Sequence, residues 1–383
     1  MAASSGGERE HDRQAALDAL HADVEANNMA GYWAVDTSLK HDEDRQVRDA
    51  KKAVPFLWKY EEAIKPLLYR SAELITTETS DRRSLVMVNP GLAPKRATTT
   101  TLYTAYRIND SKDVMPAHRH SPNAIRLGLT GKQNFTGIEG EDITFGRGDL
   151  VLTPHDTWHN HGNLGDEPAV NLSILDLPLA ETLNSIYFEH DYSEERDGEK
   201  LLVAEQSRRF TDNYSHDVYS HGGYLPRFVS HHRGAGSASP MFVYRWEIMR
   251  EMLDRFMSWD GDPYEAIMVE YVDPVNGGPV YKTMTFFAQL LRAGERTRPM
   301  KQNASLVCTP MEGAGYSIIE GQRFDWGLND TLAIPGGNWY EHVNRSDSEP
   351  AVLFIGSDEP TLKALCFYRK FGKTESGDVV QLA

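Results

Sequence analysis

Cysteine is nearly absent from this chain, because Cys308 and Cys366 are the only two among 383 residues. Two cysteines cannot build a disulfide framework or a site made of several thiolates, which argues against a disulfide-stabilised secreted domain and a structural zinc ribbon. The composition fits a reducing compartment.

Long hydrophobic runs are missing too. No apolar stretch reaches the roughly 20 residues of a membrane-spanning helix, and the start, MAASSGGEREHDRQ, lacks the apolar segment of a signal peptide. Basic residues are outnumbered, with 40 Lys and Arg against 56 Asp and Glu, for a formal net charge of −16. Such an acidic chain is a poor partner for nucleic acid or an anionic membrane. We expect a cytoplasmic protein with neither partner.

The N-terminal part has a helical pattern. Residues 1–82 begin with a short polar tail, expected to be disordered over about 1–14, and continue with two segments whose apolar residues recur at helical spacing, 14–33 and 55–75. We predict an N-terminal tail and helical arm for this part.

The rest of the sequence has a strand-and-turn pattern instead of a helical one. In residues 83–185 and again in 276–383, short apolar runs alternate with Gly, Pro, Asn and Asp, a pattern typical of an antiparallel sandwich or barrel. Residues 186–275 between them are polar and irregular, with one convincing helix near residue 250. We predict a mainly β chain with two β-domains joined by a helix-containing linker.

The two β-rich segments are similar to each other. GRGDLVLTPHDTWHNHGN and DWGLNDTLAIPGGNWYEHVN each contain a Gly, a polar turn, an apolar strand, a Pro, a Trp and a closing Asn. In this register His159 matches Tyr340 and His161 matches His342. The repeat predicts two related barrels in tandem.

Four histidines fall in pairs two residues apart: His118 with His120, and His159 with His161. Side chains two apart in a strand share a face, so a closed sheet can bring both pairs into one interior. Neutral imidazoles that converge there would bind iron, zinc, copper or nickel. A lone histidine at a strand end is usually an ordinary hydrogen-bonded residue, but two such pairs in matching motifs are less expected by chance.

Residues 116–131, followed by GDLVLTPHDTWHNHGN, resemble the two motifs of the cupin barrel. The resemblance implies a double-stranded β-helix (jelly-roll) fold and a bicupin architecture, and it puts His118, His120 and His159 on the metal-ligand positions. Ala124 stands at the position of the usual glutamate. A site of three neutral histidines would leave the full charge of a divalent metal for anionic ligands.

A narrower resemblance follows from AVPFLWKY, RRSLVMVNPGL, TTTTLYTAYRI, PAHRHSPNAIRL, GDLVLTPHDTWHNHGN and YRWE. In this order they are similar to the gentisate and salicylate 1,2-dioxygenases, which include 1-hydroxy-2-naphthoate dioxygenase. The family implies Fe(II), O2 as co-substrate, an aromatic ring with adjacent carboxylate and hydroxyl groups, and a homotetramer. Both oxygen atoms would enter between the carbons that bear these groups. Because Lys301, Asn303 and Tyr340 replace the ligands in the second barrel, we expect one iron per chain and a structural second barrel.

The same resemblance implies roles around the metal. Arg126, expected on the strand of His120, would hold the substrate carboxylate. His161 would act as an acid or base on the substrate hydroxyl or on the bound oxygen. Alternatively, it would support the metal ligands without binding the metal itself. The remaining substrate-binding positions are Arg83, Tyr103, Arg107, Ser173 and Gly128.

Departures from the family bear on the substrate. Arg107 replaces a glutamine and either adds positive charge near the substrate or pairs with an acid; Ser173 replaces the aspartate of gentisate enzymes; and Gly128 would leave room for a larger ring. These changes favour 1-hydroxy-2-naphthoate or a substituted salicylate, with gentisate as the alternative. More distant alternatives are a non-oxygenase cupin metalloenzyme and a non-catalytic binding cupin.

Overall fold

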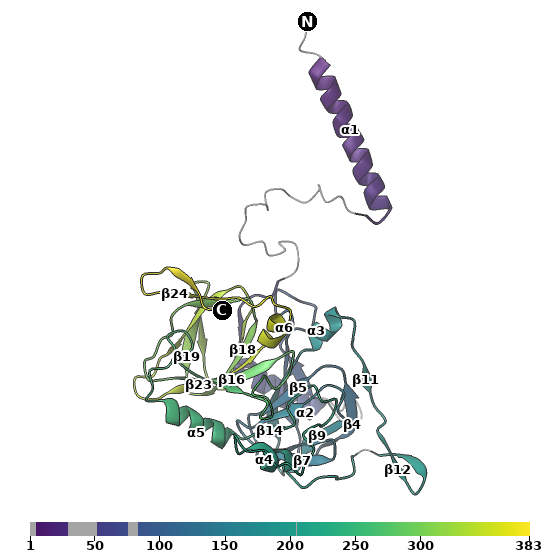
Figure 1. Cartoon of the computed structure of the whole chain (residues 1–383), viewed down its shortest axis with the longest axis vertical. Coiled ribbons are helices and arrows are strands. Elements are labelled where there is room, and N and C mark those ends of the chain that lie inside the picture. Colours follow the sequence, from purple (N-terminus) through teal and green to yellow (C-terminus); the bar gives the residue numbers. More distant parts are fainter. Residues whose placement is uncertain (1–4, 30–51, 76–82, 204) are drawn as a thin grey trace. The chain divides into compact units, whose positions relative to one another are not determined.

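The computed structural model of this chain describes residues 5–29, 52–75, 83–203 and 205–383 (Figure 1). Its internal contacts divide the chain into residues 1–51 and residues 52–383. The first unit contains helix α1 (Ser5–Ala26), most of whose described side chains are exposed. The predicted disordered tail is therefore wrong from Ser5 onward, because Glu, Arg, Gln and Ala support a helix there. Residues 30–33 of the expected helix lie outside the described residues.

The first barrel is a jelly roll of two facing sheets. One sheet has the strand order β14-β8-β5-β10-β3-β2, and the other has the order β11-β4-β9-β6-β7. Its eight central strands are β3 (Tyr103–Asn109), β4 (Val114–His120), β5 (Ala124–Gly128), β6 (Asn134–Ile138), β7 (Glu141–Phe145), β8 (Leu150–Thr153), β9 (His159–Asn163) and β10 (Ala169–Leu175). Strand β2 (Ser84–Val86) extends one edge, and α3 (Leu177–Thr182) follows β10.

The second barrel repeats this arrangement. Its sheets have the orders β1-β21-β18-β23-β16-β15 and β20-β19-β22-β17-β24-β25, so its central strands match those of the first barrel one by one. They are β16 (Thr285–Leu291), β17 (Met300–Gln302), β18 (Leu306–Glu312), β19 (Gly315–Ile319), β20 (Gln322–Trp326), β21 (Thr331–Ile334), β22 (Trp339–Asn344) and β23 (Ala351–Ser357). After them come α6 (Glu359–Ala364), β24 (Lys370–Lys373) and β25 (Val379–Gln381).

Matching hydrogen bonds support the register of the internal repeat. The side-chain amide of Asn163 donates to the carbonyl of Glu167 at 2.7 Å, and Asn344 donates to the carbonyl of Glu349 at 2.8 Å. Each asparagine closes a strand and ties down the turn after it. The repeated motif therefore encodes the same turn in both barrels.

The predicted linker and arm both add strands to the barrels. The region 186–275 contains β11 (Phe188–Glu189), β12 (Ser193–Arg196), β13 (Glu199–Leu202), α4 (Tyr214–Tyr219), β14 (Val243–Tyr244), α5 (Trp246–Phe256) and β15 (Ile267–Tyr271). Of these strands, β11 pairs with β4, β14 with β8, and β15 with β16. The segment 55–75, expected to be one helix, begins as strand β1 (Phe56–Trp58) on the edge strand β21 and continues as η3 (Tyr60–Ile64) and α2 (Lys65–Leu74).

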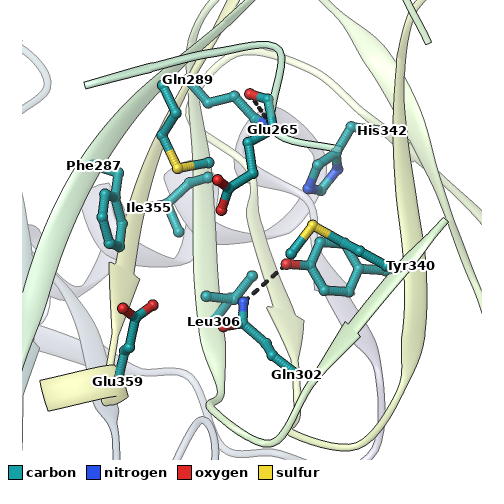
Figure 2. A pocket seen from close by; sticks show the side chains of 11 residues that line it. Glu265, Phe287, Gln289, Gln302, Leu306, Tyr340, His342, Ile355 and Glu359 are labelled. Carbon is teal, nitrogen blue, oxygen red and sulfur yellow. Dashed lines mark hydrogen bonds between the residues drawn. The ribbon is translucent and has the colours of Figure 1, made fainter. Parts of the chain in front are cut away.

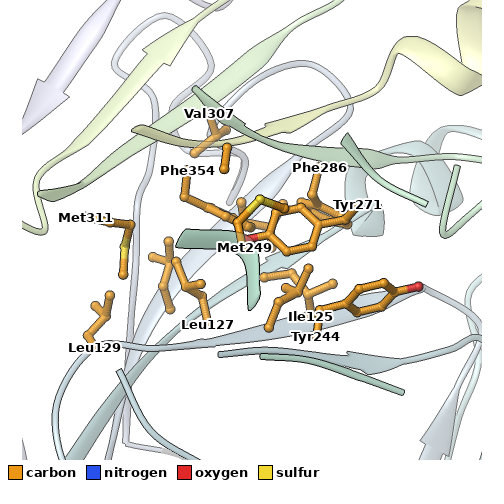
Figure 3. Packing of buried hydrophobic residues seen from close by; sticks show 14 of the residues in the cluster. Ile125, Leu127, Leu129, Tyr244, Met249, Tyr271, Phe286, Val307, Met311 and Phe354 are labelled. Carbon is orange, nitrogen blue, oxygen red and sulfur yellow. The ribbon is translucent and has the colours of Figure 1, made fainter. Parts of the chain in front are cut away.

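One hydrophobic core joins the two barrels. Ile125 and Leu127 of β5 belong to the same buried cluster as Phe286 and Phe354 of the second barrel (Figure 3). The Tyr106 hydroxyl also lies 2.7 Å from Oγ1 of Thr331 across this interface. Because these side chains fill the outward face of β5, the alternate residues of the strand face the interior of the first barrel. Within the described residues, no helix combines the length and apolar character needed to cross a membrane.

Candidate metal centre

Three buried histidines meet inside the first barrel. His118 on β4 lies directly opposite His159 on β9, and His120 follows two residues later on the same face of β4. One ligand nitrogen from each ring can be chosen so that all three lie within 4.8 Å of one another. The structure therefore brings together the three side chains predicted as metal ligands.

Each of these rings is oriented by a backbone carbonyl. Nδ1 of His118 lies 3.1 Å from the carbonyl oxygen of Pro116, Nδ1 of His120 lies 2.7 Å from that of Pro122, and Nδ1 of His159 lies 2.8 Å from that of Thr157. A carbonyl oxygen only accepts, so each Nδ1 carries the hydrogen and each Nε2 keeps its lone pair. This is the tautomer that binds a metal through Nε2.

The chemistry of the donors fits a divalent transition metal. Nε2 of His159 is buried and has no hydrogen-bond partner. Burial, reinforced by His118 and His120, lowers the pKa of His159 well below its usual value, so its ring stays neutral. Among the described residues, the cluster contains no carboxylate. Three neutral nitrogens would leave the metal charge uncompensated by the protein.

A second group of polar side chains lies beside the histidines. Nη1 of Arg126 donates to the Ser173 hydroxyl at 2.8 Å, and its Nη2 donates to Nε2 of His161 at 3.2 Å. Nδ1 of His161 lies 3.0 Å from the hydroxyl of Thr136. The ring centroid of His161 is 5.0 Å from that of His159. Three of the predicted residues, Arg126, His161 and Ser173, therefore form one network next to the metal ligands.

The tautomer and charge of His161 follow from these contacts. A guanidinium only donates, so Nε2 of His161 is the acceptor and Nδ1 carries the proton toward Thr136. Burial, together with the positive charge of Arg126, lowers the pKa of His161 well below its usual value. The imidazole is thus neutral at pH 7 and presents a basic nitrogen.

Arg126 reaches this network from a different strand than predicted. His120 ends β4, whereas Arg126 lies on β5 and pairs with Ser173 of β10. The chain turns between them, and Asp176 holds the turn by accepting a hydrogen bond of 2.8 Å from the backbone N–H of Asn123. The prediction of a shared strand is wrong, although the inward orientation holds because Arg126 alternates with the core residues of β5.

The space predicted beside Gly128 does not exist. A Cβ atom built on Gly128 would lie 1.9 Å from the carbonyl oxygen of Gly146, so glycine is needed there because two backbone segments touch. The prediction that Gly128 leaves room for a larger ring is therefore wrong.

The other predicted pocket residues have protein partners. Nε of Arg107 donates to the Asn109 side chain at 2.9 Å, so Arg107 pairs with an amide and not with an acid along this bond. Arg83 is buried and forms ion pairs with Asp113 and, at 3.6 Å, with Asp110. Contact of Arg83, Arg107 and the half-buried Tyr103 with substrate stays a prediction.

Strand β11 and His190, the residue that follows it, each place an aromatic ring beside the metal ligands, and sequence reasoning missed both. The ring of Phe188 lies 5.4 Å from that of His120, and the ring of His190 stacks at 6.1 Å from that of His118. Between them Glu189 points the other way and accepts two hydrogen bonds from Arg119. The only sequence signal is the alternation of ring, acid and ring, which is too short to identify an added strand.

In the second barrel, other residues stand at all three positions of the metal ligands. Two of these residues differ from the predicted ones, because the strand register differs. Met300 pairs with Tyr340, so Met300 and Gln302 occupy the places of His118 and His120, and the prediction of Lys301 and Asn303 is wrong by one residue. Lys301 faces outward over the Trp339 ring, just as Arg119 lies over Trp158. Both barrels carry the same one-residue bulge before these positions, since Val114 pairs with Gly162 and His118 with His159, just as Arg296 pairs with Val343 and Met300 with Tyr340.

Comparison of the sequence with known proteins gives consistent results. Residues 107–175 match the model of the cupin domain family. The chain is 33% identical over 363 residues to 5-aminosalicylate 1,2-dioxygenase of Comamonas sp., covering 93% of this chain and 90% of that protein. It is 30% identical to gentisate 1,2 dioxygenase 1 of Aquipseudomonas alcaligenes, covering 92% of this chain and 95% of that protein.

Comparison of the fold points the same way. The chain superimposes on salicylate 1,2-dioxygenase from Pseudoaminobacter salicylatoxidans, solved as adducts with gentisate, with a TM-score of 0.79 and 27% identity. The match covers 92% of this chain and 93% of the solved chain. The similarity therefore extends over both barrels.

Proposed function

Since this chain belongs to the family of gentisate- and salicylate-type ring-cleaving 1,2-dioxygenases, we propose that it opens the ring of an ortho-hydroxy aromatic carboxylate between the carbons that bear these two groups. The observation that carries the proposal is the position of Arg126, which joins His161 to Ser173 beside the three metal-ligating histidines. This arrangement offers a cation for a carboxylate and a base for a hydroxyl.

The proposed cofactor is one Fe(II) per chain, held by Nε2 of His118, His120 and His159. When bound, the iron supplies open coordination positions for the substrate oxygens and O2 and the electrons that activate O2. The protein contributes neutral donors whose orientation is fixed by backbone carbonyls. Because the three histidines are neutral, the metal would favour a substrate that chelates it as a monoanion or a dianion.

The contacts of Arg126 suggest how the substrate is received. An incoming carboxylate would take over the Arg126 hydrogen bonds that His161 and Ser173 now accept, because a carboxylate is a stronger acceptor than a neutral imidazole or a hydroxyl. Nε2 of His161 would then be free to accept the proton of the substrate hydroxyl. Thr136, which accepts from Nδ1, would hold the ring in place while His161 carries the proton.

The substrate we favour remains 1-hydroxy-2-naphthoate or a substituted salicylate, and gentisate is the alternative. Ser173 supports this preference, because it replaces the aspartate that in gentisate enzymes would serve the polar side of a dihydroxybenzoate, and its hydroxyl accepts a hydrogen bond from Arg126 instead. Gly128 no longer supports a larger ring, since the backbone of Gly146 fills the space. A cytoplasmic location and a homotetramer stay predictions from the sequence and the family.

Oxygen consumption tests the proposal. The protein is loaded with Fe(II) under anaerobic conditions and mixed with salicylate, gentisate or 1-hydroxy-2-naphthoate in air-saturated buffer. We expect uptake of one O2 per substrate with at least one of the three, and a ring-opened product in the mass spectrum. Absence of uptake with all three, despite one bound iron per chain, would contradict ring cleavage of this substrate class.

A further inference from the structure

The second barrel contains a small buried cavity at the place that corresponds to the metal centre of the first barrel. Met300, Gln302, Tyr340 and His342 line it, and these residues match the positions of His118, His120, His159 and His161 (Figure 2). The cavity measures about 20 Å³, enough for one water-sized group. The metal ligands have been replaced, but the cavity has not been filled.

His342 presents an unused hydrogen-bond donor to this cavity. The indole N–H of Trp326 donates to Oγ of Ser317 at 3.0 Å, and the same oxygen lies 2.7 Å from Nδ1 of His342. Among the described residues, Nδ1 of His342 is the one acceptor within reach of the Ser317 hydroxyl proton, so that proton is directed to Nδ1 and the hydrogen of His342 is on Nε2. Nε2 is buried and has no hydrogen-bond partner, and the whole side chain is 1% exposed.

Gln289 presents an unused acceptor to the same cavity. Its Nε2 donates to the backbone carbonyl of Glu265 at 2.9 Å, which fixes the amide orientation and leaves Oε1 buried without a partner. The side chain is also 1% exposed. A buried polar atom without a partner is costly, so one donor and one acceptor in a single cavity indicate a group that serves both.

A hydroxyl group has the required chemistry. Its oxygen can accept from Nε2 of His342, and its proton can go to Oε1 of Gln289. Tyr340 offers a further donor, because its oxygen accepts from Nε2 of Gln302 at 2.9 Å and keeps its own proton. Figure 2 shows the His342 ring and the Tyr340 hydroxyl directed toward the same space.

A larger cavity of about 350 Å³ adjoins the inner one and shares Glu265, Met268, Phe287 and Glu359 with it. Met268 and Phe287 supply apolar contact for a ring that enters from this side. Three carboxylates, of Glu265, Glu270 and Glu359, line the outer cavity against the two ammonium groups of Lys363 and Lys370, which pair with Glu359 and Glu265, so an anionic ligand would meet an excess of negative charge. The site therefore selects an uncharged compound.

We propose that the second barrel binds a small uncharged phenol or aromatic alcohol, whose hydroxyl lies between Nε2 of His342 and Oε1 of Gln289 and whose ring lies against Phe287 and Met268. This site is separate from the metal centre and does not depend on the substrate proposed for it. The second barrel is then a binding module and more than a structural support.

Phenol is the probe, and benzoate, which is anionic at pH 7, is the charged comparison. In crystals of the iron-loaded full-length protein soaked with phenol, we expect its hydroxyl in the inner cavity of the second barrel. Calorimetry should show phenol binding that becomes about tenfold weaker or more in His342→Leu and in Gln289→Leu. His221→Leu, which changes an exposed histidine, should bind as the wild type does.

Leu306→Phe provides a variant that fills the cavity without removing a polar group, and it keeps the test decisive if His342→Leu does not fold. We expect it to abolish the binding attributed to the second barrel. A soaked structure with only a water between His342 and Gln289 would overturn the proposal, as would unchanged phenol binding in Leu306→Phe. Benzoate binding at the same place would overturn the inferred selection for uncharged compounds.

Discussion

Arg126 and His161 share a hydrogen bond of 3.2 Å between Nη2 and Nε2 inside the first barrel. Burial and the positive charge of Arg126 lower the pKa of His161 and keep the imidazole neutral, and the bond occupies the nitrogen that would act on a substrate hydroxyl. In the proposed reaction, binding of a carboxylate to Arg126 would release that nitrogen, so the two groups would act in sequence. Recognition of the carboxylate would then be coupled to the availability of the base.

Substitution of Arg126 by methionine should lower catalytic efficiency without loss of the metal. We expect kcat/KM to fall by about a hundredfold or more, because loss of a buried charged partner typically costs 2–5 kcal/mol, while iron content stays at the wild-type level. Steady-state oxygen uptake and metal analysis measure the two quantities. Arg208→Met removes an exposed arginine and serves as the control. An unchanged kcat/KM in Arg126→Met would contradict the carboxylate clamp.

Removal of the Phe188 ring should weaken substrate binding without loss of metal. Phe188 lies against His120 from strand β11 and is 41% exposed, so the exposed part of its ring is accessible to a bound aromatic ring. We expect Phe188→Ala to raise KM by about tenfold, in keeping with the value of an aromatic contact. Phe228→Ala changes a side chain that is 91% exposed and should have no effect. Loss of iron in Phe188→Ala would instead assign the ring a structural role at the metal centre.

Stability should depend on pH through His342. Burial lowers the pKa of His342 to about 4, whereas an unfolded histidine titrates near 6.5. Between these values the unfolded chain binds the proton and the folded chain does not, so this stabilisation is full above pH 6.5 and is lost as the pH falls toward 4.

This dependence can be measured by denaturant unfolding at pH 7.5 and pH 5.5. Through His342 the wild type should lose about 1.4 kcal/mol more of its unfolding free energy over this interval than His342→Gln, in which the other histidines are unchanged. Equal losses in the two proteins would mean that His342 is not held neutral by burial.

Gly128 should be sensitive to substitution for a reason unrelated to the substrate. The added Cβ of Gly128→Ala would meet the carbonyl oxygen of Gly146, so we expect a loss of about 2 kcal/mol or more in unfolding free energy. Gly222→Ala, where nothing lies within 4 Å of the added atom, is the matched control. A stable Gly128→Ala protein with altered substrate preference would favour a pocket role over a backbone role.

Local patterns in the sequence predicted much of the metal centre. The two-residue spacing of His118 with His120 gives a shared face in any strand, and the resemblance to the cupin motifs placed His159 at the third ligand position. The β-rich halves were evident from their turn residues. The orientation of the ligand rings by neighbouring backbone carbonyls could not be read from these patterns, because it depends on the backbone conformation after folding.

Contacts between distant segments explain the errors. Only the pairing of Met300 with Tyr340 fixes the register of β17, and a one-residue slip in that register exchanges the inward Met300 for the outward Lys301. Strand β11 has two residues, and only its pairing with β4 reveals that it borders the site. The tight approach of Gly128 to Gly146 likewise depends on how two strands meet in space.

The central claim is that the three histidines hold the metal that carries out ring cleavage with both atoms of O2. It is tested most directly by single-turnover reactions with ¹⁸O2 and the aromatic acid that supports oxygen uptake, in wild type and in His118→Ala. The account predicts a ring-opened product of the iron-loaded wild type that carries two labelled atoms, and no product and no bound iron in His118→Ala. Product formation by His118→Ala at the wild-type rate, or incorporation of a single labelled atom, would contradict it.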